Sequence, residues 1–184
     1  MSQELRATPA EVEDALTHPL LFERLGQRAD LGGPRLLDRV EDGDLVRMSV
    51  RYRFHGRLAP GLRRAMDPDL LTWVEHATLD RSAHTQVVEV KPDHYGSRLR
   101  CRATAVIEAN GEGTLRLADV DLEVVVAIVG PAIERAIAGS LVATAGAQAR
   151  AIEDWITERR SRQAGRGGGQ RRAPRPSQVE TARS

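Results

Sequence analysis

Two neighbouring segments carry matching charges on either side of a turn signal, and this pattern constrains the fold more than any other feature. Asn110-Gly111 is typical of the two-residue type I′ turn that joins the strands of a β-hairpin. With these residues at the centre of the turn, basic residues lie opposite acidic ones: Arg102 opposite Asp119, Arg100 opposite Asp121, and Arg98 opposite Glu123. Because strand side chains alternate between faces, the other face collects Leu99, Cys101, Ala103, Val120, Leu122 and Val124. The sequence therefore predicts a long antiparallel hairpin with one charged face and one apolar face.

A second strand shows the same alternation earlier in the chain. Asp42-Gly43 is another hairpin signal, within the segment 35–55. After it, an apolar set of side chains alternates with a polar one: Val46, Met48, Val50, Tyr52 and Phe54 against Arg47, Ser49, Arg51 and Arg53. This alternation is typical of a strand with one solvated face. The segments 71–79 and 85–91 predict a further hairpin, whose buried face the pattern does not define.

A short strand is predicted within residues 2–7. Two short helices are predicted to follow it, before the segment 35–55. Thr8 and Glu11 have the spacing of a capping box, and Pro9 fits the first turn of the helix that follows. Pro19 ends that helix and begins a second one, which extends to about Leu25. Glycine and proline mark a turn at 30–34 and a longer connection at 56–69, with a helical turn near 62–66.

A long helix is predicted from Pro131 to about Arg160. Apolar residues recur at steps of three and four and form a stripe: Ile133, Ile137, Leu141, Ala145, Ala149, Ile152 and Ile156. Small residues form a lane beside it: Ala132, Ala136, Gly139, Ala143 and Gly146. Glycine inside a helix costs up to about 1 kcal/mol relative to alanine, so this lane indicates either a close contact with the sheet or space left for a ligand.

The chain is expected to form one domain, residues 1–160, followed by a disordered Arg/Gly/Pro-rich tail, residues 161–184. The tail has six arginines and one acidic residue, whereas the whole chain of 184 residues has a net charge of +1. Lys91 is the only lysine among 27 basic residues, so arginine content by itself does not indicate nucleic-acid binding. No aromatic residue lies among the arginines of the tail. We therefore expect no specific nucleic-acid partner and at most weak contact of the tail with an anionic surface.

The sequence contains no recognisable catalytic, cofactor or metal motif, and we predict none of the three. The five histidines lack metal-ligand spacing, although a hairpin would bring two of them, His76 and His84, towards each other. Cys101 is the only cysteine and fits a small buried hydrophobic residue. No leader pattern opens the chain, and no stretch approaches about 18 apolar residues, so we expect a cytoplasmic protein without a transmembrane segment.

Three motifs resemble those of a known superfamily. The most specific runs from Val124 to Glu134, where the last strand leads into the long helix, and weaker matches are Thr8-Pro9-Ala10-Glu11-Val12 and Pro60-Gly61-Leu62. Together with the order of elements, they resemble the START and polyketide-cyclase-like (SRPBCC, helix-grip) superfamily over residues 4–155. Within it, the chain is most similar to a mainly actinobacterial family of unknown function. The resemblance implies an α+β fold in which a curved antiparallel sheet wraps the long C-terminal helix and encloses a cavity.

Binding of an apolar small molecule, such as a lipid, polyketide or isoprenoid, is the function we predict. The predicted cavity lining is Met48, Val50, Tyr52, Phe54, Leu99, Cys101, Ala103, Leu122, Val124, Gly139, Ala143 and Gly146. Tyr52 is the best candidate for a polar anchor, although packing in the core explains it as well. One alternative is a cyclase- or dehydratase-like enzyme that uses Tyr52 or a histidine as acid or base. The other is an interaction module with a filled cavity and a recruiting tail. The pattern predicts neither the ligand nor the oligomeric state.

Overall fold

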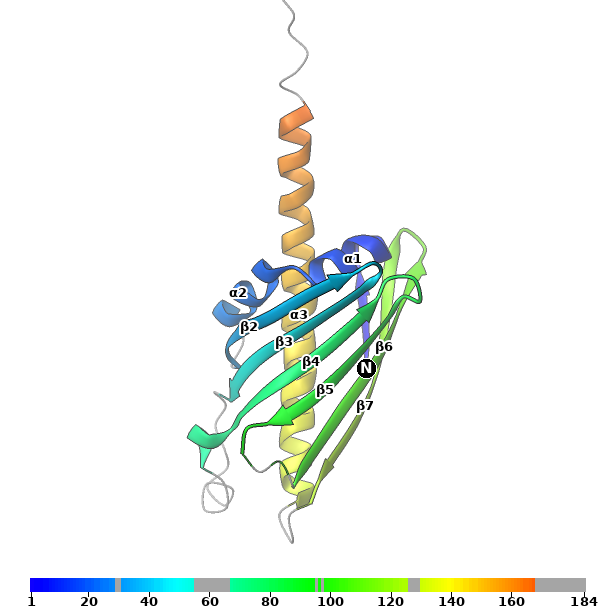
Figure 1. The fold of residues 1–184 in the computed structure, drawn as a ribbon. Coiled ribbons are helices and arrows are strands. Elements are labelled where there is room, and N and C mark those ends of the chain that lie inside the picture. Colours follow the sequence, from blue (N-terminus) through cyan, green and yellow to red (C-terminus); the bar gives the residue numbers. More distant parts are fainter. Residues whose placement is uncertain (29–30, 55–66, 95, 97, 126–129, 168–184) are drawn as a thin grey trace, which may run out of the picture.

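Seven antiparallel strands form one curved sheet, and a long C-terminal helix crosses one of its faces (Figure 1). The computed structural model describes residues 1–28, 31–54, 67–94, 96, 98–125 and 130–167. The strand order is β1-β7-β6-β5-β4-β3-β2. This arrangement confirms the predicted α+β helix-grip fold, including the two short helices that follow the first strand.

The elements follow one another along the chain in the predicted order. The N-terminal part consists of β1 (Ser2–Leu5), α1 (Pro9–Leu16) and α2 (Pro19–Arg28). The next two strands are β2 (Leu31–Asp42) and β3 (Leu45–Phe54), and a short 3-10 helix, η1 (Pro68–Leu70), precedes the rest of the sheet. The remaining elements are β4 (Thr72–Asp80), β5 (Thr85–Pro92), β6 (Leu99–Asn110), β7 (Gly113–Val124) and α3 (Gly130–Gly167).

The β6–β7 hairpin has a different register from the predicted one. Asn110 pairs with Gly113, so the turn residues are Gly111 and Glu112. Gly111 has φ of +59°, which fits the first central position of a type II′ turn. Asn110 remains in the strand, since His84 is the only non-glycine residue with positive φ in the described part of the chain. The sequence-based register was therefore wrong by two residues.

The charges nevertheless share one face, because a shift of two residues preserves the alternation of a strand. Arg102 lies opposite Asp121 and Arg100 opposite Glu123, whereas Asp119 faces Thr104. Arg100 and Glu123 form an exposed ion pair of 3.8 Å. Arg102 instead contacts Glu89 of β5 at 3.3 Å.

The predicted capping box is present at the start of α1. Thr8 caps α1, and its side chain and backbone exchange hydrogen bonds with Glu11 as predicted.

Close packing of α2 against β2 explains the glycines there: a Cβ at Gly26 would lie 2.9 Å from the Cα of Gly33. This part of β2 was predicted as a turn at 30–34, but the strand already begins at Leu31. The predicted helical turn near 62–66 lies outside the described residues.

The core lies where α1, α2 and the C-terminal half of α3 meet the sheet. Its fully buried large side chains are Val12, Leu16, Leu21, Val46, Val50, Leu79, Ile107 and Ile152. Each such side chain contributes about 1.5–3 kcal/mol by its removal from water. The helix α3 continues past the predicted end near Arg160 to Gly167, and residues 168–184 lie outside the description. Over the described residues, no helix is both long and apolar enough to cross a membrane.

Candidate functional site

The face of the sheet that looks towards α3 is formed by residues in register across five strands. In one row of this face, Tyr52 of β3 lies opposite Trp73 of β4. In the next row, Val50 lies opposite Glu75, Glu75 opposite Val90, and Val90 opposite Cys101. Cys101 in turn pairs with Leu122 of β7. We call this surface the concave face.

The described side chains fill one half of the concave face more completely than the other. Near α1 and α2, Leu79, Ile107 and Ile152 are completely enclosed. Towards the opposite end, the apolar residues remain partly exposed: Trp73, Val88, Val90, Leu99, Cys101, Ala103, Val120 and Leu122. Ile137 and Leu141 in the N-terminal half of α3 are partly exposed as well. The described side chains therefore leave apolar surface unfilled on both the sheet and the helix.

The predicted lining residues of the strands all have their side-chain positions on this face, apart from one whose side chain is outside the description. Met48, Val50, Tyr52 and Val124 are buried, and Leu99, Cys101, Ala103 and Leu122 are partly exposed. Phe54 ends β3, and its side chain lies outside the described residues. Their contact with a ligand stays a prediction.

The small-residue lane of α3 does not fit the predicted chamber. Gly139 and Ala143 are exposed, and a Cβ at Gly139 would meet nothing within 4 Å. Gly146 is half-buried beside the guanidinium of Arg150. With 3.6 residues per turn, this lane lies on the far side of the helix from the stripe that includes Ile137 and Leu141. We therefore exclude these three residues from the proposed lining.

An acidic and aromatic cluster lies at the partly exposed end of the concave face. The rings of Tyr52 and Trp73 are 5.7 Å apart and stacked. The indole Nε1 of Trp73 donates a hydrogen bond of 3.3 Å to Oε1 of Glu75, and the Tyr52 hydroxyl donates a second one to the same carboxylate. Glu75 is thus the acidic member of a cluster with two aromatic side chains.

Burial changes the acid–base properties of this cluster. Loss of hydration raises the pKa of Glu75 to about 7, against the opposing effect of the two hydrogen bonds. Burial, with Glu75 and Asp121 nearby, raises the pKa of the Cys101 thiol to about 11. Glu75 can thus donate or accept a proton near neutral pH, whereas the thiol of Cys101 stays protonated there.

Glu75 was missed in the sequence because β4 reads ambiguously. One set of alternating residues is Trp73, Glu75, Ala77 and Leu79, and the other is Val74, His76 and Thr78. Both sets mix apolar and polar side chains. The signal that resolves them is the pairing of Trp73 with Tyr52, whose face the sequence did define.

An opening adjoins this end of the concave face where β5 and β6 part. The pairing of the two strands ends at Val90 and Cys101. A pocket of about 700 Å³ lies there, lined by Leu99 and Cys101 together with charged residues of the outer face such as Arg100 and Glu123. Two predicted lining residues, Leu99 and Cys101, therefore also border this pocket.

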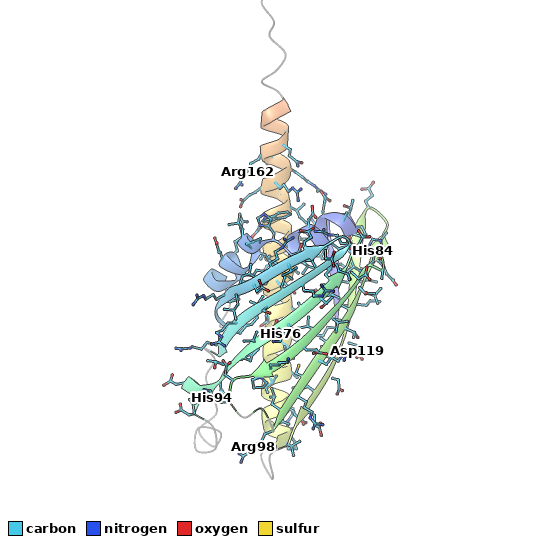
Figure 2. The ribbon with its side chains drawn as sticks, in the orientation of Figure 1. His76, His84, His94, Arg98, Asp119 and Arg162 are labelled. Carbon is cyan, nitrogen blue, oxygen red and sulfur yellow. The ribbon has the colours of Figure 1, made fainter. Side chains whose placement is uncertain are left out.

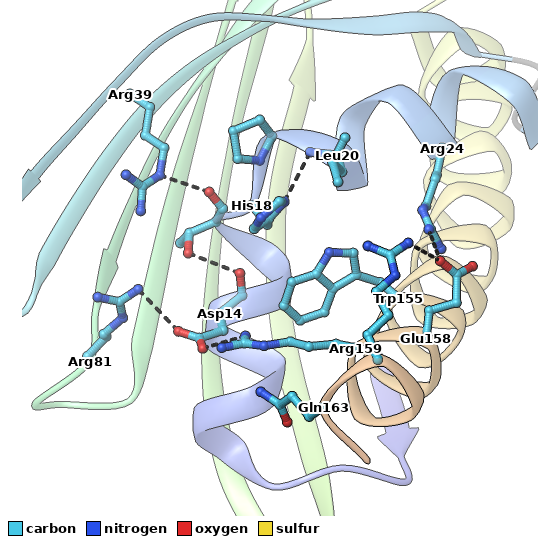
Figure 3. A pocket seen from close by; sticks show the side chains of 13 residues that line it. Asp14, His18, Leu20, Arg24, Arg39, Arg81, Trp155, Glu158, Arg159 and Gln163 are labelled. Carbon is cyan, nitrogen blue, oxygen red and sulfur yellow. Dashed lines mark hydrogen bonds and ion pairs between the residues drawn. The ribbon is translucent and has the colours of Figure 1, made fainter. Parts of the chain in front are cut away.

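A second pocket, of about 650 Å³, lies between α1, α2 and the end of α3 (Figure 3). Its acidic residues are paired with arginines: Asp14 with Arg81 and Arg159, and Glu158 with Arg24 and Arg162. The guanidinium of Arg159 also lies 5.0 Å from the ring centre of Trp155. These contacts attach the end of α3 to the N-terminal helices, and we assign the pocket no ligand.

The structure does not bring His76 and His84 together. His76 contacts Ser49 at 3.1 Å, and His84 contacts Glu13 at 2.6 Å. Figure 2 shows His76 within the sheet and His84 at the turn between β4 and β5. Among the described residues, no cluster of histidine, cysteine and acidic side chains has the arrangement of a metal site.

Solved structures share this fold at low sequence identity. TTHA0849 from Thermus thermophilus has a TM-score of 0.59 and 15% identity, over 86% of this chain and 95% of that one. Ara h 8.0201 has a TM-score of 0.55 and 10% identity, with the same coverage of 86% and 95%. The di-domain ARO/CYC StfQ from the steffimycin biosynthetic pathway has a TM-score of 0.50 and 13% identity, over 86% of this chain and 46% of that one. No curated protein sequence matches significantly.

The sheet that curves around a C-terminal helix gives this protein the helix-grip fold, as the sequence predicted. The chain belongs to the family described as "Protein of unknown function (DUF2505)", which matches residues 1–156.

Proposed function

We propose that this protein binds an apolar small molecule, of the lipid, polyketide or isoprenoid type, between the concave face and the N-terminal half of α3. The observation that carries the proposal is the partly exposed apolar surface on both elements, which includes Leu122 on the sheet and Leu141 on the helix. Apolar surface removed from water contributes roughly 25 cal/mol per Å². A ligand that covers both surfaces gains this free energy without a change of fold.

The opening between β5 and β6 supports the proposal by offering an entrance. Leu99 and Cys101 line it and also belong to the concave face. Charged side chains such as Arg100 and Glu123 surround its outer rim. An apolar rear wall with a polar rim is the usual construction of a small-molecule site.

Native mass spectrometry of the freshly purified protein, followed by solvent extraction, tests whether a ligand is carried along. Titration with N-phenyl-1-naphthylamine, a neutral dye that fluoresces in apolar surroundings, tests the site directly. We expect saturable binding by the wild type and at least tenfold weaker binding by Ala103→Phe, which fills the concave face.

Ala143→Phe is the matched control, because Ala143 is exposed on the outer side of α3. It is expected to bind the dye as the wild type does. The proposal is wrong if the wild type binds neither dye nor co-purified ligand, or if both variants lose binding equally while remaining folded.

Cyclase- or dehydratase-like catalysis is a second candidate, and Glu75 is the observation that favours it. A carboxyl group with a pKa of about 7, held by Tyr52 and Trp73, suits removal of a proton next to a carbonyl group. The test is deuterium exchange at the α-carbon of 2-decanone in D₂O. Enzyme-dependent exchange that is lost in Glu75→Gln, with dye binding retained, supports this candidate, whereas absence of exchange by the wild type opposes it.

The interaction module with a recruiting tail is not proposed. Its evidence in the sequence is the basic segment 161–184, of which residues 168–184 lie outside the described part of the chain. It stays a prediction.

A further inference from the structure

An arginine lies on the concave face under α3. Arg116 of β7 pairs with Gln3 of β1 on one side and with Ile107 of β6 on the other. Its guanidinium donates hydrogen bonds of 2.6 Å to Oε1 of Gln3 and 2.7 Å to Oε1 of Gln86 on β5. The side chain thus reaches across β6, where the residue paired with Gln86 is the small Ala105.

The two glutamines hold this guanidinium in place. Both are buried, Gln3 with 9% and Gln86 with 6% of its surface exposed. The side-chain nitrogen of Gln3 also donates a hydrogen bond of 2.5 Å to the Ala145 carbonyl of α3. The guanidinium of Arg116 therefore connects β7 with β1 and β5, and Gln3 extends this connection to α3.

The charge of Arg116 has no counterion in the described part of the protein. Both of its hydrogen-bond partners are neutral amides, and none of the observed ion pairs includes it. Its buried Nε has no hydrogen-bond partner. Burial lowers the pKa of this guanidinium to about 10, which shows that the surroundings disfavour the cation. Buried charges in proteins are normally paired, so the arrangement is incomplete as it stands.

Arg116 lies at the border between the filled and the unfilled halves of the concave face. Its neighbours towards α1 are Ile107 and Leu5, which are buried. In the other direction along β7, Ala118, Val120 and Leu122 are partly exposed, as is Arg116 itself. The guanidinium therefore stands at the inner end of the apolar surface to which we assign the ligand.

The two ends of this apolar surface differ in chemistry. Glu75 lies on β4, four residues from Leu79, which pairs with Gln86. At a rise of about 3.3 Å per residue, this separation is roughly 13 Å along the strand. A ligand that spans the surface meets a cation at one end and a carboxyl group at the other.

We propose that the ligand is an apolar monocarboxylic acid and that Arg116 binds its carboxylate, while Gln3 and Gln86 orient the guanidinium. This inference rests on the proposed binding function. A guanidinium presents planar N–H groups that match a carboxylate, and its bonds to the glutamines leave other N–H groups unused. A carboxylate supplies both the missing charge and the missing acceptors. The apolar part of the ligand then extends along Val120 and Leu122, with its far end towards Tyr52.

The test compares decanoic acid with 1-decanol, which differ in the charged group, as competitors of N-phenyl-1-naphthylamine at pH 7.5. For the wild type, we expect the acid to compete at least tenfold better than the alcohol. In Arg116→Met, which keeps an unbranched side chain, dye and alcohol should bind within threefold of the wild type while the preference for the acid disappears. Arg47→Met, on the exposed outer face of β3, is the matched control and should keep the preference.

Equal competition by acid and alcohol in the wild type overturns the inference, and dye binding would then still support the proposed function. A preference that persists in folded Arg116→Met also overturns it, because Arg116 would then be a structural bridge only. Absence of binding by all three compounds removes the proposed function and the inference together. If Arg116→Met does not fold, Gln86→Met serves instead, since release of the guanidinium from one orienting contact should weaken the preference at least threefold.

Discussion

Tyr52 and Trp73 stack across β3 and β4 with their ring centres 5.7 Å apart and their planes 7° from parallel. Such a pair contributes about 0.5–1.5 kcal/mol beyond the burial of its area. Both rings also point a polar hydrogen at the carboxylate of Glu75. The stack therefore fixes the position of the one acid on this part of the concave face, and the properties of Glu75 can be tested separately from any ligand.

Glu75→Gln should make the protein less sensitive to rising pH. The pKa of Glu75 is about 7 in the folded state against 4.5 ordinarily, so the folded state binds the proton more tightly than the unfolded state does. This contribution is complete below pH 4.5 and is lost as pH rises to 7, by up to about 3 kcal/mol at 1.36 kcal/mol per pKa unit. Urea unfolding at pH 4.5 and pH 8 measures the difference.

Glu89→Gln, on the outer face, is the control and should leave that dependence unchanged. A wild-type stability that does not fall between these pH values, or a fall that Glu75→Gln retains, would contradict the assignment of the pKa to Glu75.

Tyr52→Phe should move the same transition to higher pH. The hydroxyl of Tyr52 donates to the carboxylate of Glu75 and so favours its charged form. Without it the pKa of Glu75 in the folded state rises, so the fall in stability still begins near pH 4.5 but extends to higher pH. The midpoint of stability against pH, from unfolding curves at half-unit intervals, gives the result; a midpoint that moves down would show that the hydroxyl does not contact the carboxylate.

The sequence predicted the faces of the strands better than the pairing between them. The alternation in β3 placed Val46, Met48, Val50 and Tyr52 correctly because it needs only local information. The β6–β7 register was wrong because Asn110-Gly111 fits two turn types, and only the observed φ of Gly111 and the pairing of Asn110 distinguish them. Since the error was an even number of residues, it changed the partners and preserved the faces.

The same alternation contained a signal for Arg116 that the sequence interpretation did not use. On β7, the residues assigned to the buried face include Val120, Leu122 and Val124, and continuing that set backwards reaches Arg116. Its neighbours Leu115 and Leu117 suggested the opposite orientation. A basic residue at an inward position was therefore predictable, whereas its contacts with Gln3 and Gln86 depend on strands far apart in sequence.

Three residues of the small-residue lane were predicted to line the cavity, but Gly139 and Ala143 are exposed on α3, because a helix taken alone does not show which of its faces meets the sheet. Substitution by alanine is expected to have opposite effects on stability at Gly139 and at Gly111. At Gly139 a methyl group enters open space within a helix, so Gly139→Ala should stabilise the protein by up to about 1 kcal/mol.

At Gly111 the φ of +59° disfavours any side chain, so Gly111→Ala should destabilise the protein by about 1–2 kcal/mol. Thermal and urea unfolding of both variants gives the two values. Destabilisation by Gly139→Ala would show that this surface of α3 is covered.

Cys101 should react slowly with thiol reagents although it is only half-buried. Burial, together with the nearby charges of Glu75 and Asp121, raises the pKa of its thiol from 9.0 to about 11. Because the thiolate is the reactive form, this shift reduces reactivity at pH 8 by roughly a hundredfold. Cys101 is the only cysteine, so absorbance with Ellman's reagent reports on it alone.

Two further results connect this rate to the site. Glu75→Gln removes one of the negative charges that disfavour the thiolate, and the reaction should become faster at pH 8. N-phenyl-1-naphthylamine should slow it in proportion to site occupancy, because Cys101 lies on the concave face and lines the opening between β5 and β6. A rate equal to that of free cysteine would contradict the burial of the thiol. Dye binding without protection would place the dye away from Cys101, and therefore away from the site proposed for the ligand.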